Sequence, residues 1–339
     1  MLRIVSEASA WHGFCATYGV ADPYYSWPYL ELWARDEGGQ PWGLVWEGPG
    51  GAVIYPVVRV PLDALPGGQG RCDIRTPYDF GGPLCVGADP EEALRAFEHA
   101  AGPVFERWGV VTEFARLHPF VVRAGHAAST LHAENLIVDL TQDHGAIQAG
   151  FGSTCRYNIR MAARRGVTAR VEWRPSARDS TAFASLYAET MARLEAPGSY
   201  CFSAETLAGL LVIEGVGLIV AEHDGVIVAA LCMIRSSGAL FYFLASSSLS
   251  ARRLCANNLL LDAAVREGQR LGLRHLHLGG GAPSLRKFKG HFATGTVPYH
   301  LVKRVVDPAA YEGLCRGVGV EPDRGFPAYR EWLRARVTR

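Results

Sequence analysis

Each half of the sequence predicts the same order of elements: a helical start, antiparallel strands, a helix and one further strand. In the second half, Asp224-Gly225 between two apolar alternating runs is a strong β-hairpin signal. This order predicts an α/β (α+β) fold with mixed, largely antiparallel sheets flanked by helices, and its repetition predicts two tandem domains of one kind. The expected strands lie at 42–47, 52–60, 111–117, 134–140, 218–223, 226–235, 239–245 and 275–278, and the expected helices at 24–33, 90–108, 154–165, 180–194, 257–271 and 329–336.

Length and composition support two soluble domains. A chain of 339 residues is long for one core, and 49% hydrophobic with 20% charged residues is typical of globular proteins. No apolar run is long enough to span a bilayer, and we recognise no signal peptide, so no membrane insertion is expected. Eight cysteines without a Cys-x-x-Cys pair indicate free thiols in a reducing cytoplasm. With a net charge of +1, a polyanion must be bound by a local patch.

Basic side chains cluster at the start of the second half of the sequence. Arg156, Arg160 and Arg164 stand at i, i+4 and i+8 of an expected helix, so one face carries three guanidinium groups. Arg165 follows them, and no Asp or Glu occurs between residues 144 and 171. Such a face suits phosphates, either of a diphosphate or of an RNA backbone. The alternative is a solvated helix face balanced by distant acids, which the missing local acids weaken.

The segment after strand 239–245 lies where some enzymes bind the phosphates of a ligand. A strand–loop–helix junction presents backbone N–H groups that can bind a phosphate. Acetyl-CoA-dependent acyltransferases of the GNAT type place glycines there, because bare backbone can approach a pyrophosphate. Residues 252–257 read Arg-Arg-Leu-Cys-Ala-Asn and contain no glycine. Their side chains would crowd that approach, which argues against coenzyme A.

Lysine is scarce, with only three among the 34 Lys and Arg residues. Lys287 and Lys289 both follow the three glycines 279–281 at a strand end. A lysine that persists among arginines indicates a position that a planar guanidinium cannot serve, although chance or a solvated turn is the alternative. Its ammonium could stabilise an oxyanion that develops in acyl transfer. Phe288, between the lysines, is expected to point to the other side and pack.

Arg193 precedes an aromatic loop that contains Tyr200. Its guanidinium could clamp a carboxylate or a phosphate. Pairing with Glu189 or Glu195 is the alternative, and taken alone it is the better one. We recognise no His-Glu-x-x-His motif, Walker loop or Ser-His-Asp order, and we expect no metal site.

Several motifs occur in order over most of the chain. They lie at 77–83, 117–119, 156–162 with Gly166-Val167, 257–262, and 279–281 with 285–289. Together they resemble Fem-type aminoacyltransferases of the GNAT superfamily. The resemblance implies GNAT-like domains at 1–148 and 149–307, with a tail at 308–339 that packs back on the first. It also implies transfer of an amino acid from aminoacyl-tRNA to an amine, forming an amide without a cofactor or coenzyme A.

The resemblance extends to single residues. Lys289 matches the family's catalytic-channel lysine, Phe288 its neighbouring aromatic residue, and Arg193 an acceptor-binding arginine. Lys287 is expected to assist in RNA contact. Further substrate contacts are expected from Tyr78, Tyr200, Tyr242 and Asn257, and tRNA contacts from Arg156, Arg160, Arg164, Arg165 and Lys287.

The acceptor and two other functions stay open. A small amine, peptide or nucleoside, as in antibiotic assembly, is slightly favoured over a peptidoglycan precursor, and the chain lacks the long helical hairpin of some cell-wall members. An acyl-CoA-dependent N-acyltransferase of the same fold is the second hypothesis. A catalytically silent RNA- or peptide-binding relative is the third. We expect a cytoplasmic monomer.

Overall fold

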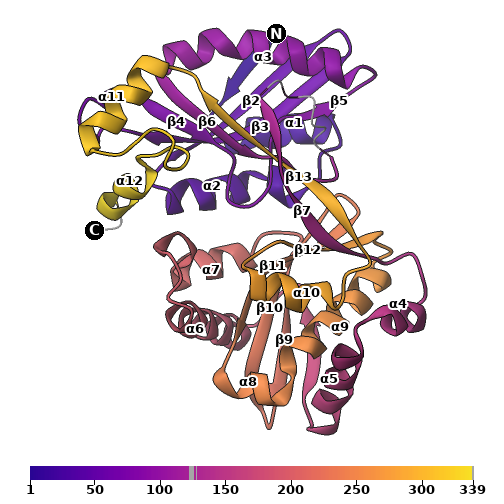
Figure 1. The fold of residues 1–339 in the computed structure, drawn as a ribbon. Helices are drawn as coiled ribbons and strands as arrows, with labels where there is room; N and C mark the ends of the chain where they lie inside the picture. Colours follow the sequence, from indigo (N-terminus) through magenta and orange to yellow (C-terminus); the bar gives the residue numbers. More distant parts are fainter. Residues whose placement is uncertain (122–125, 127, 338–339) are drawn as a thin grey trace. The chain divides into compact units, whose positions relative to one another are not determined.

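The computed structural model describes residues 1–121, 126 and 128–337, and its chain divides into two compact units (Figure 1). Unit 1 comprises Met1–Ala133 and Pro298–Arg339, whereas unit 2 comprises Glu134–Val297. Unit 2 is therefore inserted between the two segments of unit 1. The chain passes from one unit to the other within two long strands, β7 at Ser129–Asp139 and β13 at Gly295–Val305. The last two residues of the predicted tail, 338 and 339, lie outside the described residues.

Unit 1 is built on a mixed sheet of order β1-β2-β3-β4-β6-β13, and β5 also pairs with β3. Its neighbouring strands are antiparallel except β4 and β6, which are parallel. The strands are β1 Leu2–Val5, β2 Gln40–Gly48, β3 Gly51–Pro61, β4 Cys72–Arg75, β5 Leu84–Val86 and β6 Val110–Arg116. The helices are α1 Ala8–Thr17, α2 Trp27–Asp36, α3 Pro90–Arg107, α11 Pro308–Val318 and α12 Arg330–Val337.

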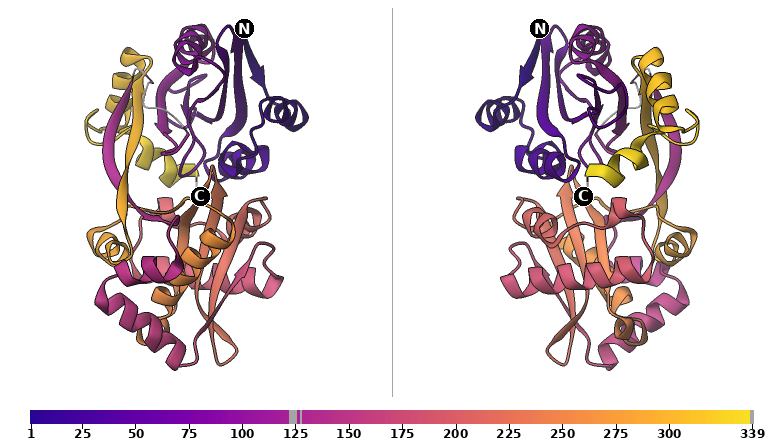
Figure 2. Two further views of the ribbon diagram at one scale, coloured as in Figure 1. Left: turned by 90° about the vertical axis from the view of Figure 1, so that its right-hand side faces the viewer. Right: turned by 90° about the vertical axis from the view of Figure 1, so that its left-hand side faces the viewer.

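Helices cover both faces of this sheet. Asp89 caps the start of α3, since its carboxylate accepts a hydrogen bond from the backbone N–H of Glu92. The buried side of α3, which includes Phe97 and Phe105, packs on one face of the sheet. Helices α1, α2, α11 and α12 share a second core on the other face. Figure 2 shows the C-terminal helices, in yellow, among the elements of unit 1.

Polar contacts fasten the C-terminal helices to unit 1. The hydroxyl of Tyr329 donates to the Asp73 carboxylate on β4 at 2.9 Å. Arg330 and Arg334 both pair with the buried carboxylate of Glu37, Arg334 at 2.8 Å. The last residues of the chain therefore complete a core that its first residues begin.

Unit 2 is built on the remaining strands of the same hydrogen-bonded order, β7-β12-β11-β10-β9-β8. Here too one neighbouring pair is parallel, β11 with β12, and the others are antiparallel. The remaining strands are β8 Thr168–Glu172, β9 Val216–His223, β10 Val226–Ser236, β11 Ala239–Ser247 and β12 His275–Gly279. The helices are α4 His144–Gly150, α5 Ser153–Arg164, α6 Ala177–Arg193, α7 Ala204–Leu211, α8 Leu249–Leu254, α9 Ala256–Arg270 and α10 Pro283–Gly290.

The sheet of unit 2 is buried on both faces, which explains its nearly continuous apolar strands. On β9, Ile219 and Ala221 belong to the core beneath α5 and α9. Leu218 and Val220 are fully buried on the other side, where α6 packs on β10 and β11 and α7 packs on β9. The tandem arrangement of two mixed sheets flanked by helices is the predicted fold class. Within the described residues, no helix combines the length and apolar character needed to cross a membrane.

One segment differs from its predicted conformation, and a second had no predicted one. Residues 249–254, expected to form a loop, are helix α8, because the Ser248 hydroxyl accepts from the backbone N–H of Ala251 and caps its first turn. Residues 283–290 lie outside the predicted elements. These residues form α10, which Pro283 begins in a position that favours proline. Lys287 and Lys289 consequently point in different directions.

Candidate active site

The parallel strands of unit 2 part at their C-terminal ends. β11 and β12 pair over Ala239–Phe241 and His275–His277. Beyond these residues β11 continues to pair with β10, whereas β12 pairs with β7 through Gly279. Ligands of open α/β sheets bind at the carboxyl ends of parallel strands, so the point where β11 and β12 part is the first place to seek a site.

Two glycines direct the chain from β12 into α10. Gly279 has φ +71° and Gly281 has φ +118°, conformations that side chains disfavour. An added Cβ at Gly281 would lie 2.9 Å from the Leu285 side chain. The turn is therefore specific for glycine, as the three-glycine motif predicted. It sets α10 directly after the end of β12.

Helix α10 places Lys289 at this turn. The side chain is 5% exposed, and its Nζ donates to the carbonyl oxygen of Gly280 at 3.2 Å. The ammonium also lies 4.3 Å from the ring centroid of Tyr242 on β11. Burial raises the pKa of the Tyr242 phenol, which keeps it protonated at neutral pH. Two predicted site residues, Lys289 and Tyr242, thus come together across the parted strands.

Phe288 and Lys287 occupy different surroundings from Lys289. Phe288 is half-buried, packs against the core of unit 2 and makes an edge contact with Phe292 at 5.6 Å. Lys287 is exposed. Asn135, which the sequence did not indicate, is buried and has its Oδ1 3.3 Å from the position of a Cβ on Gly280. Only the folding of β7 beside β12 brings it there, so no local sequence signal could have found it.

A second cluster forms at the end of β11. Arg193 Nη2 donates to the carbonyl oxygen of Ser247 at 2.9 Å, and Nη1 pairs with Glu189 at 3.2 Å. The side chain of Asn257, at the start of α9, approaches the Ser247 hydroxyl at 3.5 Å. Arg193 and Asn257 are therefore brought together, and the pairing with Glu189 weighed as an alternative is present. Tyr242 lies five residues earlier on the same strand.

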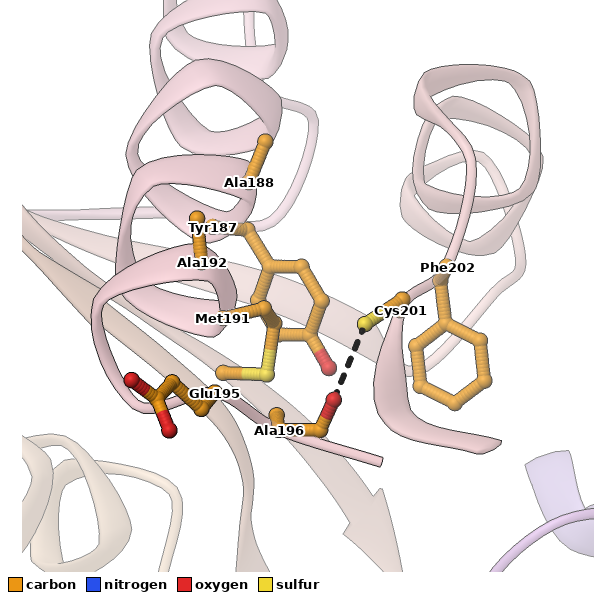
Figure 3. A pocket seen from close by; sticks show the side chains of 8 residues that line it. All are labelled: Tyr187, Ala188, Met191, Ala192, Glu195, Ala196, Cys201 and Phe202. Carbon is orange, nitrogen blue, oxygen red and sulfur yellow. Dashed lines mark hydrogen bonds between the residues drawn. The ribbon is translucent and has the colours of Figure 1, made fainter. Parts of the chain in front are cut away.

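A cavity of about 280 Å³ lies between the C-terminal part of α6 and the loop that follows it (Figure 3). Met191, Tyr187 and Phe202 form much of its apolar wall, and Glu195 contributes a carboxylate. The Tyr187 hydroxyl donates to the backbone oxygen of Tyr200 at 2.7 Å and holds the loop. The ring of Tyr200 is exposed and does not line the cavity. No sequence pattern indicated that this cavity exists.

Tyr78 belongs to unit 1, whereas the other predicted site residues belong to unit 2. Its ring stacks on Trp33 with centroids 4.8 Å apart, and the Arg116 guanidinium lies 5.6 Å from it. In unit 1 the loop after β4 continues along β6, where Gly81 pairs in parallel with Leu117. In unit 1 the loop after β4 therefore continues the parallel pairing, whereas β11 and β12 of unit 2 part.

The predicted arginine face divides in the structure. Arg160 and Arg164 are exposed on α5. Arg156 instead donates to the carbonyl oxygens of Ala149, at 2.7 Å, and Phe151. Arg165 donates to the carbonyl oxygen of Arg253, at the end of α8. The segment between β11 and α9, which lacks the glycines of a phosphate-binding loop, thus forms helix α8. Helix α9 then begins with the buried Ala256.

Comparisons with known proteins agree with this architecture. Residues 153–290 match the family model of the acetyltransferase (GNAT) domain. A structure of FemX superposes with a TM-score of 0.67 at 12% identity, covering 92% of this chain and 99% of FemX. The C-terminal domain of a putative lysylphosphatidylglycerol synthetase from Agrobacterium fabrum gives 0.58 at 15% identity, covering 93% and 98%. L-PGS from Bacillus licheniformis gives 0.56 at 14%, covering 93% and 97%. A search of curated proteins found no match to the sequence.

These likenesses establish the fold. The matched segment contains the parted strands, the glycine turn and Lys289. Among the described residues, no group of three or more His, Cys, Asp or Glu side chains is arranged to hold a metal ion. Residues 153–290 of unit 2 are thus similar to the GNAT acetyltransferase domain, and the chain as a whole shares the fold of FemX.

Proposed function

We propose that this protein is an aminoacyltransferase that moves an amino acid from aminoacyl-tRNA to an amine acceptor and forms an amide bond. The observation that carries the proposal is the buried ammonium of Lys289, held by Gly280 and Tyr242 where β11 and β12 part. A fixed cation in such a position suits a reaction in which negative charge develops on a carbonyl oxygen.

The reaction needs little covalent chemistry from the protein. The acceptor nitrogen attacks the ester carbonyl and forms the new C–N bond, and the ester C–O bond to the tRNA ribose breaks. The ribose oxygen leaves and takes up a proton equivalent to the one that the amine loses. Lys289 would stabilise the oxyanion between these steps. Orientation of the two substrates and this electrostatic effect would supply most of the acceleration.

Helix α8 supports a donor other than coenzyme A. It fills the segment between β11 and α9, and its Arg252 and Arg253 side chains replace the bare backbone that a pyrophosphate would approach. The acceptor would bind near Arg193 and Asn257, which meet at Ser247. A small amine, peptide or nucleoside of antibiotic assembly, or a soluble peptidoglycan precursor, fits this proposal. The protein would act as a cytoplasmic monomer without a cofactor.

The match to an acetyltransferase domain favours a second candidate, an N-acyltransferase that uses acyl-CoA. One assay distinguishes the two. The protein is incubated with a panel of amines and either a charged tRNA pool carrying labelled amino acids or a set of acyl-CoA donors, and amides are identified by mass spectrometry.

We expect amide formation from charged tRNA, abolished when RNase removes the tRNA before the reaction. Uncharged tRNA with free amino acid controls for uncatalysed coupling and should give no amide. Amide formation from acyl-CoA alone would replace the proposal with the second candidate. Stable tRNA binding without turnover of any donor would instead support a non-catalytic RNA-binding protein.

A further inference from the structure

The exposed face of α5 carries an aromatic side chain among its arginines. Tyr157 is 54% exposed, and it precedes Arg160 by three positions and Arg164 by seven. These spacings place the three side chains along one face of the helix. The other face, with Cys155, Ile159 and Ala162, is buried in the core. Tyr157 is thus presented to solvent together with two guanidinium groups.

Helix α8 extends this basic surface. Arg165, at the C-terminal end of α5, donates to the carbonyl oxygen of Arg253 and so joins the two helices. Arg252 and Arg253 are both exposed. The sequence contains no Asp or Glu from 144 to 171 or from 246 to 261. We call Tyr157, Arg160, Arg164, Arg252 and Arg253 the α5/α8 surface.

The α5/α8 surface is linked to the candidate active site through the beginning of α5. The backbone N–H of Gly152, just before α5, donates to the carbonyl oxygen of His291 at 2.9 Å, directly after α10. The rings of Phe151 and Phe292 pack with centroids 4.9 Å apart. The end of α10, which carries Lys289, therefore lies against the start of α5 (Figure 1). A twelve-residue helix then leads about 18 Å away from it.

We infer that the α5/α8 surface binds unpaired RNA, with Tyr157 stacking on a base and the arginines contacting the phosphates on either side of it. This inference rests on the proposed use of a tRNA-borne donor, and it adds to that proposal the kind of RNA bound and the residue that selects it. Exposed aromatic rings within a basic surface suit single strands, because unpaired bases offer their faces while duplexes do not. An anionic membrane fits less well, since a helix that lies in a membrane needs a broad apolar face, and that of α5 is buried.

Binding of labelled RNA to the full-length protein tests the inference. The probes are a short unpaired oligonucleotide and a blunt-ended, fully paired duplex of two strands, and fluorescence anisotropy gives Kd over a range of salt concentrations. Tyr157→Ala should weaken binding of the unpaired probe about tenfold, the loss expected for one stacked base, without changing the salt dependence. Tyr157→Phe, which keeps the ring, should bind as the wild type does. Neither substitution should alter binding of the duplex.

The arginines should affect both probes, because they contact phosphates and not bases. Each of Arg160→Ser, Arg164→Ser and Arg252→Ser should weaken both probes and lower the slope of log Kd against log salt by about one. Arg178→Ser is the matched control, because Arg178 is exposed in unit 2 but pairs with Glu222 away from this surface. The control should leave both the affinity and the slope unchanged.

Three results would overturn the inference: equal affinity of Tyr157→Ala and wild type for unpaired RNA, an equal loss of affinity for the duplex, or binding to anionic vesicles that the same substitutions abolish while RNA binding persists. The transfer assay keeps this separate from the proposed function. Tyr157-dependent RNA binding with amide formation from acyl-CoA alone would refute the proposed donor and support the surface. Transfer from charged tRNA with no effect of Tyr157→Ala on binding would do the reverse.

Discussion

At the scale of residues, Lys289 shows how far composition can lead. The scarcity of lysine and the preceding glycines indicated this position, and the structure buries it beside Gly280 and Tyr242. Tyr242 as its direct neighbour could not be derived from spacing, because 46 positions separate the two in the sequence and only the parting of β11 from β12 joins them. Arg156 shows the converse. Its helical spacing suggested an exposed cation, but nearby carbonyl groups hold its guanidinium.

Lys289→Ala should lower kcat about 100- to 1000-fold, the usual effect of removing one group that stabilises an oxyanion. The melting temperature should change little or rise, since burial of an ammonium is costly. Lys287→Ala is the control and should leave kcat near that of the wild type, because Lys287 is exposed on another side of α10. Steady-state kinetics and thermal melting measure both. Full activity in Lys289→Arg would show that the position does not require lysine.

Asp73 should make the stability of unit 1 depend on pH. Burial raises the pKa of its carboxyl from 3.8 to about 6, although Thr112 and Tyr329 donate hydrogen bonds to it. A pKa raised on folding means that the folded state holds the proton more tightly. Its contribution is therefore complete below pH 3.8 and is lost as the pH rises through about 6. A rise of about two units corresponds to about 3 kcal/mol.

Asp73→Asn should flatten this dependence, because the amide oxygen still accepts hydrogen bonds but does not titrate. Urea unfolding followed by tryptophan fluorescence reports on unit 1, since every tryptophan except Trp173 belongs to it. Asp323→Asn, at an exposed aspartate of unit 1, is the control. Parallel curves for Asp73→Asn and wild type between about pH 4 and pH 6 would contradict the assignment.

At the scale of elements, local signals predicted several boundaries. The Asp224-Gly225 turn occurs where the sequence placed it, and Asp89 and Gly272 lie at the ends of the predicted helices 90–108 and 257–271, where each satisfies the backbone locally. Helices α1, α4, α8 and α10 were not predicted, and the last two of these are only six and eight residues long. Such short helices depend on packing against the rest of the protein, so a local pattern carries little information about them.

Gly281→Ala should disturb the active site through the turn before α10. An alanine at φ +118° costs about 1–3 kcal/mol, and its Cβ would meet Leu285 at 2.9 Å. We expect a several-fold to tenfold lower kcat, because α10 and its Lys289 must shift. Gly290→Ala, at the other end of α10, is the control, since nothing lies within 4 Å of its added Cβ. Equal kcat values for the two variants would show that the turn does not set the position of Lys289.

At the scale of the whole molecule, the sequence predicted two related units but placed the boundaries at 148 and 307, where expected elements ended. The contact division at 133/134 and 297/298 falls inside β7 and β13. Hydrophobic periodicity continues along such strands without interruption. The local pattern therefore does not show that one part of a strand belongs to unit 1 and the other part to unit 2. The expected similarity of the two halves does appear, since each sheet has one parallel pair followed by an antiparallel strand.

Removal of residues 308–339 should unfold unit 1 selectively. It deletes the Tyr311 and Leu314 side chains from a shared core and the Tyr329 contact to Asp73. Hydrogen exchange read peptide by peptide should show loss of protection in β2 and β3 while β9 and β10 stay protected. Leu260→Ala, in the core of unit 2, should give the opposite pattern and cost about 2–5 kcal/mol. Equal loss in both units would mean that they unfold as one cooperative body.

The insertion of unit 2 into unit 1 also fixes an order of events during synthesis. Residues 134–297 are continuous, so all of unit 2 has been translated before the last 42 residues of unit 1, Pro298–Arg339, are made. Until then, β6 lacks its partner β13 and presents an unpaired edge. The part of the protein that is made first is therefore the part that finishes folding last, and this waiting interval is when a nascent chain of this design depends most on chaperones.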